Sequence, residues 1–302
     1  MLNINLINSE KSDVKSTITT FPDGEPHVVL GEINRKESYK VICRITNPNE
    51  LFILSQVADI LNRQGVIWEL DIFYLMSMRM DRVINFNESF TLKIVADTIN
   101  NMHASKVRIY HCHSKRTFEE IKNSVDMETD YDIKLRIPYY GYKSICYPDN
   151  GAYNRYCDYD LKYYYNGIIV LKKERDLDDK GKIKTMEIYS EGHVCKDGSS
   201  ILISDDLCDA GGTFCCAERI LREKYPHSKI GIFVRHLVNP IGLKNLSEHF
   251  DEVFITNSYK DWKNDIIENK LNNVTVIDII QDVCIQSAPK PYFPGISGHL
   301  NF

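Results

Sequence analysis

Acidic and glycine residues cluster in the segment Ile201-Leu-Ile-Ser-Asp-Asp-Leu-Cys-Asp-Ala-Gly-Gly-Thr-Phe214. Asp205 and Asp206 directly follow a short apolar run, and Asp209 opens a turn of small residues that ends at Thr213. Paired carboxylates can accept hydrogen bonds from sugar hydroxyls or hold Mg²⁺ through water. A turn that leads into a helix presents free backbone N–H groups, which bind phosphate together with the helix dipole. The segment therefore predicts a site for a phosphorylated sugar.

Apolar residues on both sides of these acids predict the elements that position them. Ile201–Ser204 is expected to form a buried strand, and the spacing of Ala217, Ile220 and Leu221 predicts a helix after Thr213. Acid-rich and glycine-rich turns also occur at strand ends for geometric reasons alone. The order of buried strand, paired acids, glycines, threonine and amphipathic helix is what favours a binding site over a plain turn.

The rest of the chain alternates strand-like and helix-like segments, which predicts an α/β fold with mainly parallel sheets flanked by helices. Strands are expected at 16–20, 27–31, Tyr39–Ile45, Trp68–Leu75, Lys106–His111, Gly167–Leu171, Lys229–His236, Glu252–Thr256 and Val274–Ile279, and helices at Pro48–Arg63, Thr91–Met102 and Gly242–Phe250. A chain of 302 residues has room for two such domains. A loss of periodicity near residue 135 divides 1–135 from 136–302.

Composition restricts the class of protein and its compartment. A net charge of −5 argues against a nucleic-acid-binding protein, so any anion site must be local. Nine cysteines without C-x-x-C spacing indicate reduced thiols in a cytosol rather than a disulfide scaffold. The sequence shows no secretory leader and no apolar run that approaches membrane-spanning length. A soluble, cytoplasmic protein with no membrane partner and no nucleic-acid partner is expected.

The central segment resembles the ribose-phosphate binding motif of phosphoribosyltransferases and phosphoribosyl pyrophosphate synthetases. The resemblance implies that Asp205 and Asp206 hold the ribose 2- and 3-hydroxyls and that the following loop holds the 5-phosphate. The loop residues are Asp209, Ala210, Gly211, Gly212 and Thr213. Further motifs in the same order extend the similarity to the phosphoribosyl pyrophosphate synthetases over nearly the whole chain.

Three of these motifs resemble the family's ATP side. Phe21-Pro-Asp-Gly-Glu25 is similar to F-x-D-G-E, which in relatives reaches the adenine of a neighbouring subunit and implies a homo-oligomer. Arg79-Met-Asp-Arg82 lies where the family has R-Q-D-[RK] in its ATP-binding loop. His113 takes the place of the histidine of D-L-H-A, a contact of triphosphate and Mg²⁺. The implied ATP-binding residues are Phe21, Asp23, Glu25, Arg79, Asp81 and His113.

Other motifs resemble the reacting side. Pro148-Asp-Asn-Gly-Ala152 is similar to P-D-A-G-G, which implies that Asp149, with His113, serves the metal. Lys173 and Arg175 match the K-x-R of the catalytic loop, and Thr256-Asn257 resembles T-[DN]-T. The resemblance thus implies two phosphoribosyltransferase-like domains and a Mg²⁺-dependent pyrophosphokinase. Such an enzyme transfers the β,γ-diphosphate of ATP to the anomeric hydroxyl of ribose 5-phosphate, giving phosphoribosyl pyrophosphate and AMP.

Three departures from the family pattern affect the expected site. His111 stands where the family has an aspartate, which removes a carboxylate from the metal environment. His111 and His113 form H-x-H, but two ligands do not make a zinc site. Met80 replaces a glutamine of the ATP loop, and Ala210 replaces a threonine of the phosphate loop. A loop that has lost a hydroxyl donor and gained space would suit a phosphodiester acceptor such as ADP-ribose, which is the alternative to ribose 5-phosphate and would place the enzyme in NAD salvage.

Two other classes of function stay open on the residues alone. A catalytically silent homologue would bind nucleotides and regulate an active partner; His111 and Met80 favour it, whereas Lys173 and Arg175 argue against it. A phosphoribosyltransferase would share the central loop but consume the pyrophosphorylated sugar. The two-domain length and the segment Phe21–Glu25 argue against a phosphoribosyltransferase.

Overall fold

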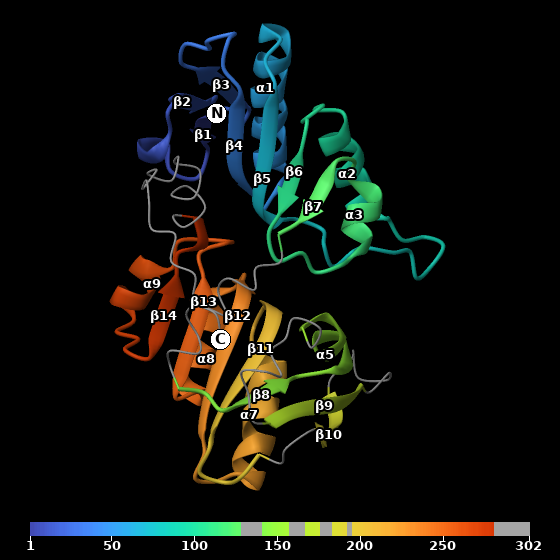
Figure 1. Ribbon diagram of the computed structural model, residues 1–302, viewed down its shortest axis with the longest axis vertical. Helices are drawn as coiled ribbons and strands as arrows, with labels where there is room; N and C mark the ends of the chain where they lie inside the picture. The colour runs from blue at the N-terminus through green and yellow to red at the C-terminus, as the bar shows by residue number, and fades with distance from the viewer. Residues whose placement is uncertain (128–140, 157–166, 176–182, 192–194, 281–302) are drawn as a thin grey trace, which may run out of the picture.

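The computed structural model describes residues 1–127, 141–156, 167–175, 183–191 and 195–280. Side chains are described throughout these ranges except in 173–175 and in most of 183–191. Figure 1 shows two lobes, one built on strands β1 to β7 and the other on strands β8 to β14; we call them the N-terminal and C-terminal lobes. The expected boundary near residue 135 lies outside the described residues, as does the tail from Ser287, so the division into 1–135 and 136–302 stays a proposal.

The N-terminal lobe contains a five-stranded parallel sheet with the order β1-β4-β5-β6-β7. Its strands are β1 (Leu2–Asn5), β4 (Tyr39–Ile45), β5 (Trp68–Leu75), β6 (Val107–Ile109) and β7 (Ser124–Asp126). A separate antiparallel hairpin joins β2 (Ser16–Thr20) to β3 (Pro26–Leu30). The helices are η1 (Ser9–Lys11), α1 (Pro48–Gln64), α2 (Thr91–Asn100) and α3 (Arg116–Glu120).

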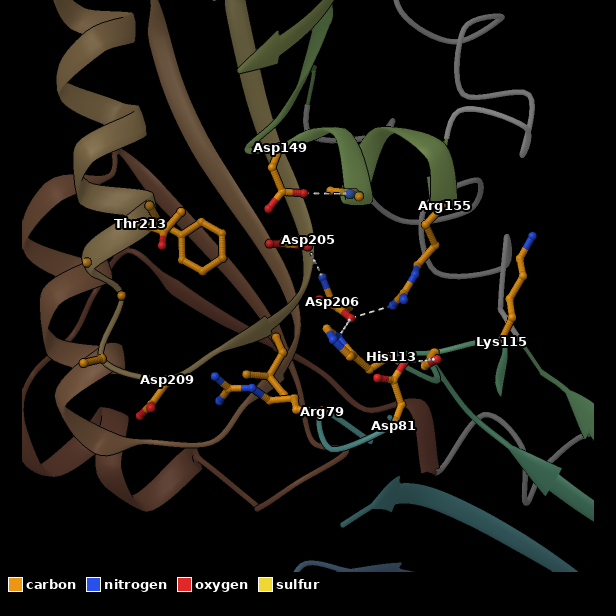
Figure 2. Close-up of a pocket in the computed structure, with 18 of the residues that line it drawn as sticks. Arg79, Asp81, His113, Lys115, Asp149, Arg155, Asp205, Asp206, Asp209 and Thr213 are labelled. Carbon is orange, nitrogen blue, oxygen red and sulfur yellow. Dashed lines mark hydrogen bonds and ion pairs between the residues drawn. The ribbon is translucent and has the colours of Figure 1, made fainter. Parts of the chain in front are cut away.

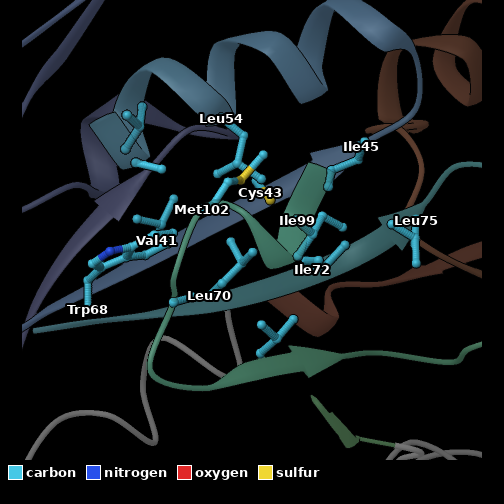
Figure 3. Close-up of a cluster of buried hydrophobic side chains, with 14 of the residues drawn as sticks. Val41, Cys43, Ile45, Leu54, Trp68, Leu70, Ile72, Leu75, Ile99 and Met102 are labelled. Atoms are coloured by element: carbon cyan, nitrogen blue, oxygen red, sulfur yellow. The ribbon is translucent and has the colours of Figure 1, made fainter. Parts of the chain in front are cut away.

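Helix α1 is long because its two ends are capped and one face is apolar. The Asn47 side chain accepts a hydrogen bond from the Glu50 N–H at 3.1 Å, and Glu50 Oε2 accepts one from the Thr46 N–H at 2.5 Å. The first bond satisfies a donor that the start of the helix leaves free, and the second ties the residue before the cap to the first turn. Gly65, in the left-handed conformation (φ 69°), ends the helix. Figure 3 shows how Leu54 of this helix packs on β4 and β5 in the core of the lobe.

The C-terminal lobe contains a seven-stranded sheet with the order β10-β9-β8-β11-β12-β13-β14. All neighbouring pairs are parallel except β9 and β10. Its strands are β8 (Ser144–Tyr147), β9 (Gly167–Arg175), β10 (Ile183–Glu191), β11 (Ser200–Cys208), β12 (Lys229–Leu237), β13 (Glu252–Thr256) and β14 (Val274–Ile277). The helices are α5 (Asn150–Tyr156), α7 (Gly212–Lys224), α8 (Pro240–His249) and α9 (Lys263–Glu268).

The predicted α/β fold with two helix-flanked, mainly parallel sheets is confirmed. Strand β11 is longer than expected, because it pairs with β12 as far as Cys208 and so contains Asp205 and Asp206 within the ladder. Strand β9 extends beyond the expected Leu171 to Arg175, where it pairs antiparallel with β10. Among the described helices, none is both long and apolar enough to cross a bilayer.

One buried apolar cluster contains residues of both lobes. Phe73 and Tyr110 of the N-terminal lobe stack at a ring distance of 4.3 Å and belong to the same cluster as Phe233 and Phe254 of the C-terminal lobe. The shared cluster fixes how the two sheets face each other, and it thereby sets the distance between functional groups that the lobes contribute separately.

Candidate active site

A cavity of about 660 Å³ brings residues of both lobes together (Figure 2). The N-terminal lobe contributes Arg79, Asp81, Arg82, His113, Ser114 and Lys115. The C-terminal lobe contributes Asp149, Gly151, Ala152, Arg155, Asp205, Asp206, Leu207, Asp209, Ala210, Gly211, Gly212, Thr213 and Phe214. The cavity lies at the carboxyl ends of β8 and β11, where open parallel sheets generally bind ligands.

Asp206 is the residue through which the two lobes meet inside the cavity. Its Oδ2 lies 2.5 Å from His113 Nδ1 and accepts a hydrogen bond of 2.5 Å from Arg155 Nη1. The residue is only 6% exposed. Burial by itself would raise the pKa of this carboxyl, but its contacts with His113 and Arg155 lower the pKa overall. Asp206 is therefore a stable anion.

Asp205 has the opposite electrostatic environment. Burial raises the pKa of its carboxyl well above the ordinary range, and the negative charge of Asp206 raises it further. Asp149, which lines the same cavity, adds to this repulsion. Asp205 Oδ1 accepts a hydrogen bond of 2.8 Å from the Asp206 N–H. A cation placed near Asp205 and Asp149 would offset the repulsion that disfavours the ionised form of Asp205.

The predicted phosphate loop adopts the conformation that an anion site requires. Gly211 has a φ of 85°, which favours glycine, and precedes α7 without any side-chain cap on that helix. Gly212, the first residue of α7, is exposed and has open space around the position of a Cβ. The first N–H groups of α7 and its dipole therefore face the cavity without a competing side-chain acceptor.

Helix α8 supports this loop from behind. Asn245 Nδ2 donates a hydrogen bond of 2.8 Å to the Ala210 carbonyl, and Asn239 Nδ2 donates one of 2.8 Å to Asp209 Oδ1. A Cβ on Gly242 would lie only 1.9 Å from the carbonyl oxygen of Asp209. The loop thus rests directly on the backbone of α8, and only a glycine allows that approach.

Asp81 lies in a local network on the ATP side of the predicted site. Arg82 donates hydrogen bonds of 2.7 and 2.9 Å to its two carboxylate oxygens, and Ser114 Oγ donates one of 2.5 Å. The contact with Arg82, assisted by the one with Ser114, lowers the pKa of Asp81 to about 2. Arg79 is exposed beside this network and lines the cavity (Figure 2).

Two groups of predicted site residues are not brought to the cavity by the described part of a single chain. Phe21, Asp23 and Glu25 are exposed on the turn between β2 and β3 and do not line the cavity. Lys173 and Arg175 belong to β9, and their side chains lie outside the described residues.

Arg155 is a cavity residue that the sequence motifs did not indicate. It lies on α5, six positions after Asp149, and it also donates a hydrogen bond of 3.0 Å to the Cys112 carbonyl of the other lobe. A seven-residue helix has too little periodicity to be predicted. The only available signal was a basic residue one or two turns after a candidate acid.

A buried histidine joins the two lobes next to the site. His236 Nε2 lies 2.7 Å from the His111 carbonyl oxygen, and because a carbonyl can only accept, Nε2 carries the proton. His236 Nδ1 lies 2.8 Å from Ser258 Oγ. Burial, assisted by His111, lowers the pKa of His236 to about 3. This contact holds the segment that presents His113 to Asp206.

The neutral state of His236 predicts how the stability of the protein depends on pH. In the unfolded chain this residue takes up a proton near its ordinary pKa of 6.5, whereas in the folded protein it does so near 3. As the pH is lowered from 6.5 toward 3, the free energy of unfolding should therefore fall by about 1.4 kcal/mol per pH unit because of this group alone; above pH 6.5 this contribution should be constant. Urea unfolding at pH 4 to 7 should give a shallower slope for His236→Gln than for the unaltered chain. Parallel slopes would contradict the assignment.

No protein-family model matches the chain. The ribose-phosphate pyrophosphokinase of Helicobacter hepaticus is 27% identical over 256 residues, which cover 81% of this chain and 79% of that protein. The enzyme of the same name from Sulfolobus acidocaldarius is 24% identical over 293 residues, covering 89% of this chain and 90% of that protein. The phosphoribosylpyrophosphate synthetase structure from Mycobacterium smegmatis has a TM-score of 0.71 at 20% identity, covering 90% of this chain and 89% of that one.

These similarities support a divergent member of the ribose-phosphate pyrophosphokinase family. They run through both lobes, so the family resemblance is not confined to the phosphate loop. The structural match independently supports the fold of two phosphoribosyltransferase-like sheets. These relatives are ribose-phosphate pyrophosphokinases, which are transferases.

Proposed function

We propose that the protein transfers the β,γ-diphosphate of ATP to the anomeric hydroxyl of a ribose 5-phosphate-type acceptor. The observation that carries the proposal is the cavity between the lobes, where a helix N-terminus and paired carboxylates face Arg79, Asp81 and His113. The helix N-terminus and the paired carboxylates suit a sugar phosphate, and the side with Arg79 and His113 suits a polyphosphate.

The reaction asks the protein mainly to position two anionic substrates and to offset their charge. The anomeric oxygen forms a bond to the β-phosphorus while the bond from that phosphorus to the α,β-bridging oxygen breaks. AMP leaves with that oxygen, and the hydroxyl proton is released. Asp206 is suited to accept hydrogen bonds from the ribose hydroxyls, since Arg155 and His113 keep it ionised. The loop Asp209–Thr213 would hold the 5-phosphate through backbone N–H groups.

Asp149 and Asp205 are the carboxylates best suited to Mg²⁺. Their mutual repulsion calls for a cation, and Mg²⁺ typically uses one or two carboxylates together with substrate phosphates and water. No cluster of three potential metal-ligating side chains occurs among the described residues, and the proposed ion would be held jointly with substrate. Bound there, the ion would neutralise charge on the triphosphate. His113, whose Nδ1 contacts Asp206, is proposed to face the triphosphate with its other ring nitrogen.

Lys173 and Arg175, alternate residues of β9, are proposed to stabilise the transition state together. Lys173→Ala should reduce AMP release by about 100-fold or more, because a charge that acts on the transferring group is lost. Single-turnover AMP formation at saturating ATP, Mg²⁺ and acceptor measures the effect. Near-normal turnover would remove Lys173 from the proposed machinery.

A homo-oligomer is proposed because the described lining on the ATP side of the cavity, from Arg79 to Lys115, contains no phenylalanine, tyrosine or tryptophan side chain for adenine. Phe21 is 49% exposed at the tip of the β2–β3 turn, beside the exposed Asp23 and Glu25. A neighbouring copy could contribute this turn to the cavity. Sedimentation of the intact chain should show an oligomer. The ATP KM of a Phe21→Ser variant should be higher than that of the unaltered protein.

A second acceptor, ADP-ribose, is favoured by one observation. The loop is open at Gly212, where a Cβ would meet nothing within 4 Å, and Ala210 and Gly212 are both exposed. An acceptor phosphate that continues into a larger group would have room to leave the cavity there. The ratio of kcat/KM for ribose 5-phosphate and ADP-ribose decides between the two acceptors, and a clear preference for ribose 5-phosphate would reject the extended one.

The test of the proposed activity is the fate of labelled ATP. With Mg²⁺ and either acceptor, AMP and a pyrophosphorylated sugar should form in equal amounts. Release of ADP and orthophosphate would reject diphosphate transfer. Binding of ATP without any AMP would indicate the catalytically silent homologue, and consumption of the pyrophosphorylated sugar would indicate a phosphoribosyltransferase.

A further inference from the structure

Arg235 is a buried cation next to the paired acids. The residue lies on β12 and is only 2% exposed. Its Nη1 donates hydrogen bonds of 3.1 Å to Ser204 Oγ and 3.2 Å to the Asp205 carbonyl oxygen. Within the part of the chain that the structure describes, no ion pair joins this guanidinium to a carboxylate. A buried charge of this kind is costly unless other contacts compensate for it.

Aromatic rings provide that compensation. The guanidinium carbon lies 3.8 Å from the centre of the Tyr156 ring and 4.9 Å from that of Phe233. A cation over an aromatic face is stabilised most strongly where water is excluded, and Tyr156 is itself only 2% exposed. Arg235 therefore binds Tyr156 to β11 and β12 at once.

Tyr156 is the last residue of α5, and that short helix carries two groups of the proposed site. Asp149 immediately precedes α5 and accepts a hydrogen bond of 3.0 Å from the Ala152 N–H. Arg155, next to Tyr156, donates to Asp206 Oδ2 at 2.5 Å. A helix of seven residues has little stability of its own, so its position depends on tertiary contacts such as the stack on Arg235.

We propose that Arg235 is a positioning residue for the acceptor acid Asp206, acting through Tyr156 to hold the end of α5 so that Arg155 stays aligned with that carboxylate. The inference rests on the proposed function for the identity of the acceptor. Arg235 itself is not proposed to contact the substrate. The planar guanidinium is required, because a lysine ammonium cannot stack on the ring while it also donates to Ser204 and Asp205.

The experiment compares steady-state constants and folding for Arg235→Met, Arg235→Lys, Tyr156→Leu and Tyr156→Phe. Arg235→Met, Arg235→Lys and Tyr156→Leu should each raise the KM for the acceptor by about tenfold and leave the KM for ATP within about twofold. Tyr156→Phe keeps the ring and should keep both constants. The double variant Arg235→Met/Tyr156→Leu should be no worse than the worse single variant, because both changes remove the same contact.

Lys229→Met is the matched control. Lys229 lies on the same strand, 5.4 Å from the centre of the Tyr142 ring, and is remote from the cavity. Its replacement should leave both KM values unchanged. A purely structural role of Arg235 predicts a lower melting temperature with an unchanged ratio of the two KM values, and that result would overturn the proposal. Wild-type behaviour of Arg235→Lys would overturn the requirement for stacking.

Two outcomes separate this inference from the proposed function. If Arg235→Met does not fold, the proposal is tested by comparing the acceptor KM of Tyr156→Leu with that of Tyr156→Phe. Equal values for the two variants would overturn the proposal. If the unaltered protein neither releases AMP nor binds ribose 5-phosphate or ADP-ribose in calorimetry, the proposed function fails. If the unaltered protein does release AMP, and every variant has the KM values of the unaltered protein, only the role of Arg235 fails.

Discussion

Asp206→Asn is expected to reduce AMP release from ATP by at least about 100-fold. The carboxylate of Asp206 is the only described group that contacts both Arg155 and His113, so it joins the acceptor side of the cavity to the ATP side. Asparagine has nearly the same shape but no charge. It would remove the charge from the bond that Arg155 makes to Asp206 and would present one acceptor oxygen to the ribose in place of two.

The control for this substitution is Asp197→Asn. Asp197 also holds a histidine, since its Oδ2 lies 2.6 Å from His227 Nδ1, but this pair lies on the surface and outside the cavity. AMP release by the control should match that of the unaltered protein. Circular dichroism melts of both variants show whether they are folded. A folded Asp206→Asn protein that retains more than about a tenth of the activity would contradict the proposed role of Asp206.

Gly242→Ala is expected to raise the KM for the acceptor by about tenfold or more, although alanine is the better helix former by about 1 kcal/mol. The added Cβ would lie 1.9 Å from the Asp209 carbonyl oxygen and 3.1 Å from Leu237 Cδ1. Neither α8 nor β12 can retreat easily, because both pack in the core, so the loop should move. A displaced loop presents its N–H groups at the wrong distance from a phosphate.

Gly231→Ala is the matched overpacking control for this prediction. Its Cβ would lie 2.0 Å from Tyr142 Oη inside the sheet and outside the cavity. Both variants should lose about 1 to 3 kcal/mol of stability in urea unfolding. Only Gly242→Ala should raise the acceptor KM, measured in initial-rate assays at saturating ATP. Equal acceptor KM values in the two variants would show that the contact with Asp209 does not position the loop.

Long elements with a clear hydrophobic pattern were predictable. Tyr39–Ile45 and Trp68–Leu75 have the bounds expected from their apolar runs, and α1 ends one residue beyond the expected Arg63. The short elements β1, β7, β8, α3, α5 and α9 were not predicted. Their stability comes from neighbouring strands and from the core rather than from a periodic pattern of their own.

The motifs identified candidate site residues, but they could not identify the contacts between them. Arg79, Asp81, His113, Asp149 and the loop from Asp209 to Thr213 do line one cavity. That Asp206 meets His113 and Arg155, and that Arg235 lies buried behind Asp205, depends on how the two lobes pack.

The sequence by itself determined the alternation of strands and helices, the glycine turn before α7, and the kinds of charge available to a sugar phosphate and a polyphosphate. These are local properties, because turn conformation and apolar periodicity depend on residues close together in the chain. Tertiary structure alone decided the pairing of charges across the cavity. Asp206 and His113 are 93 positions apart, and the different pKa directions of Asp205 and Asp206 arise from burial and from partners that no local pattern specifies.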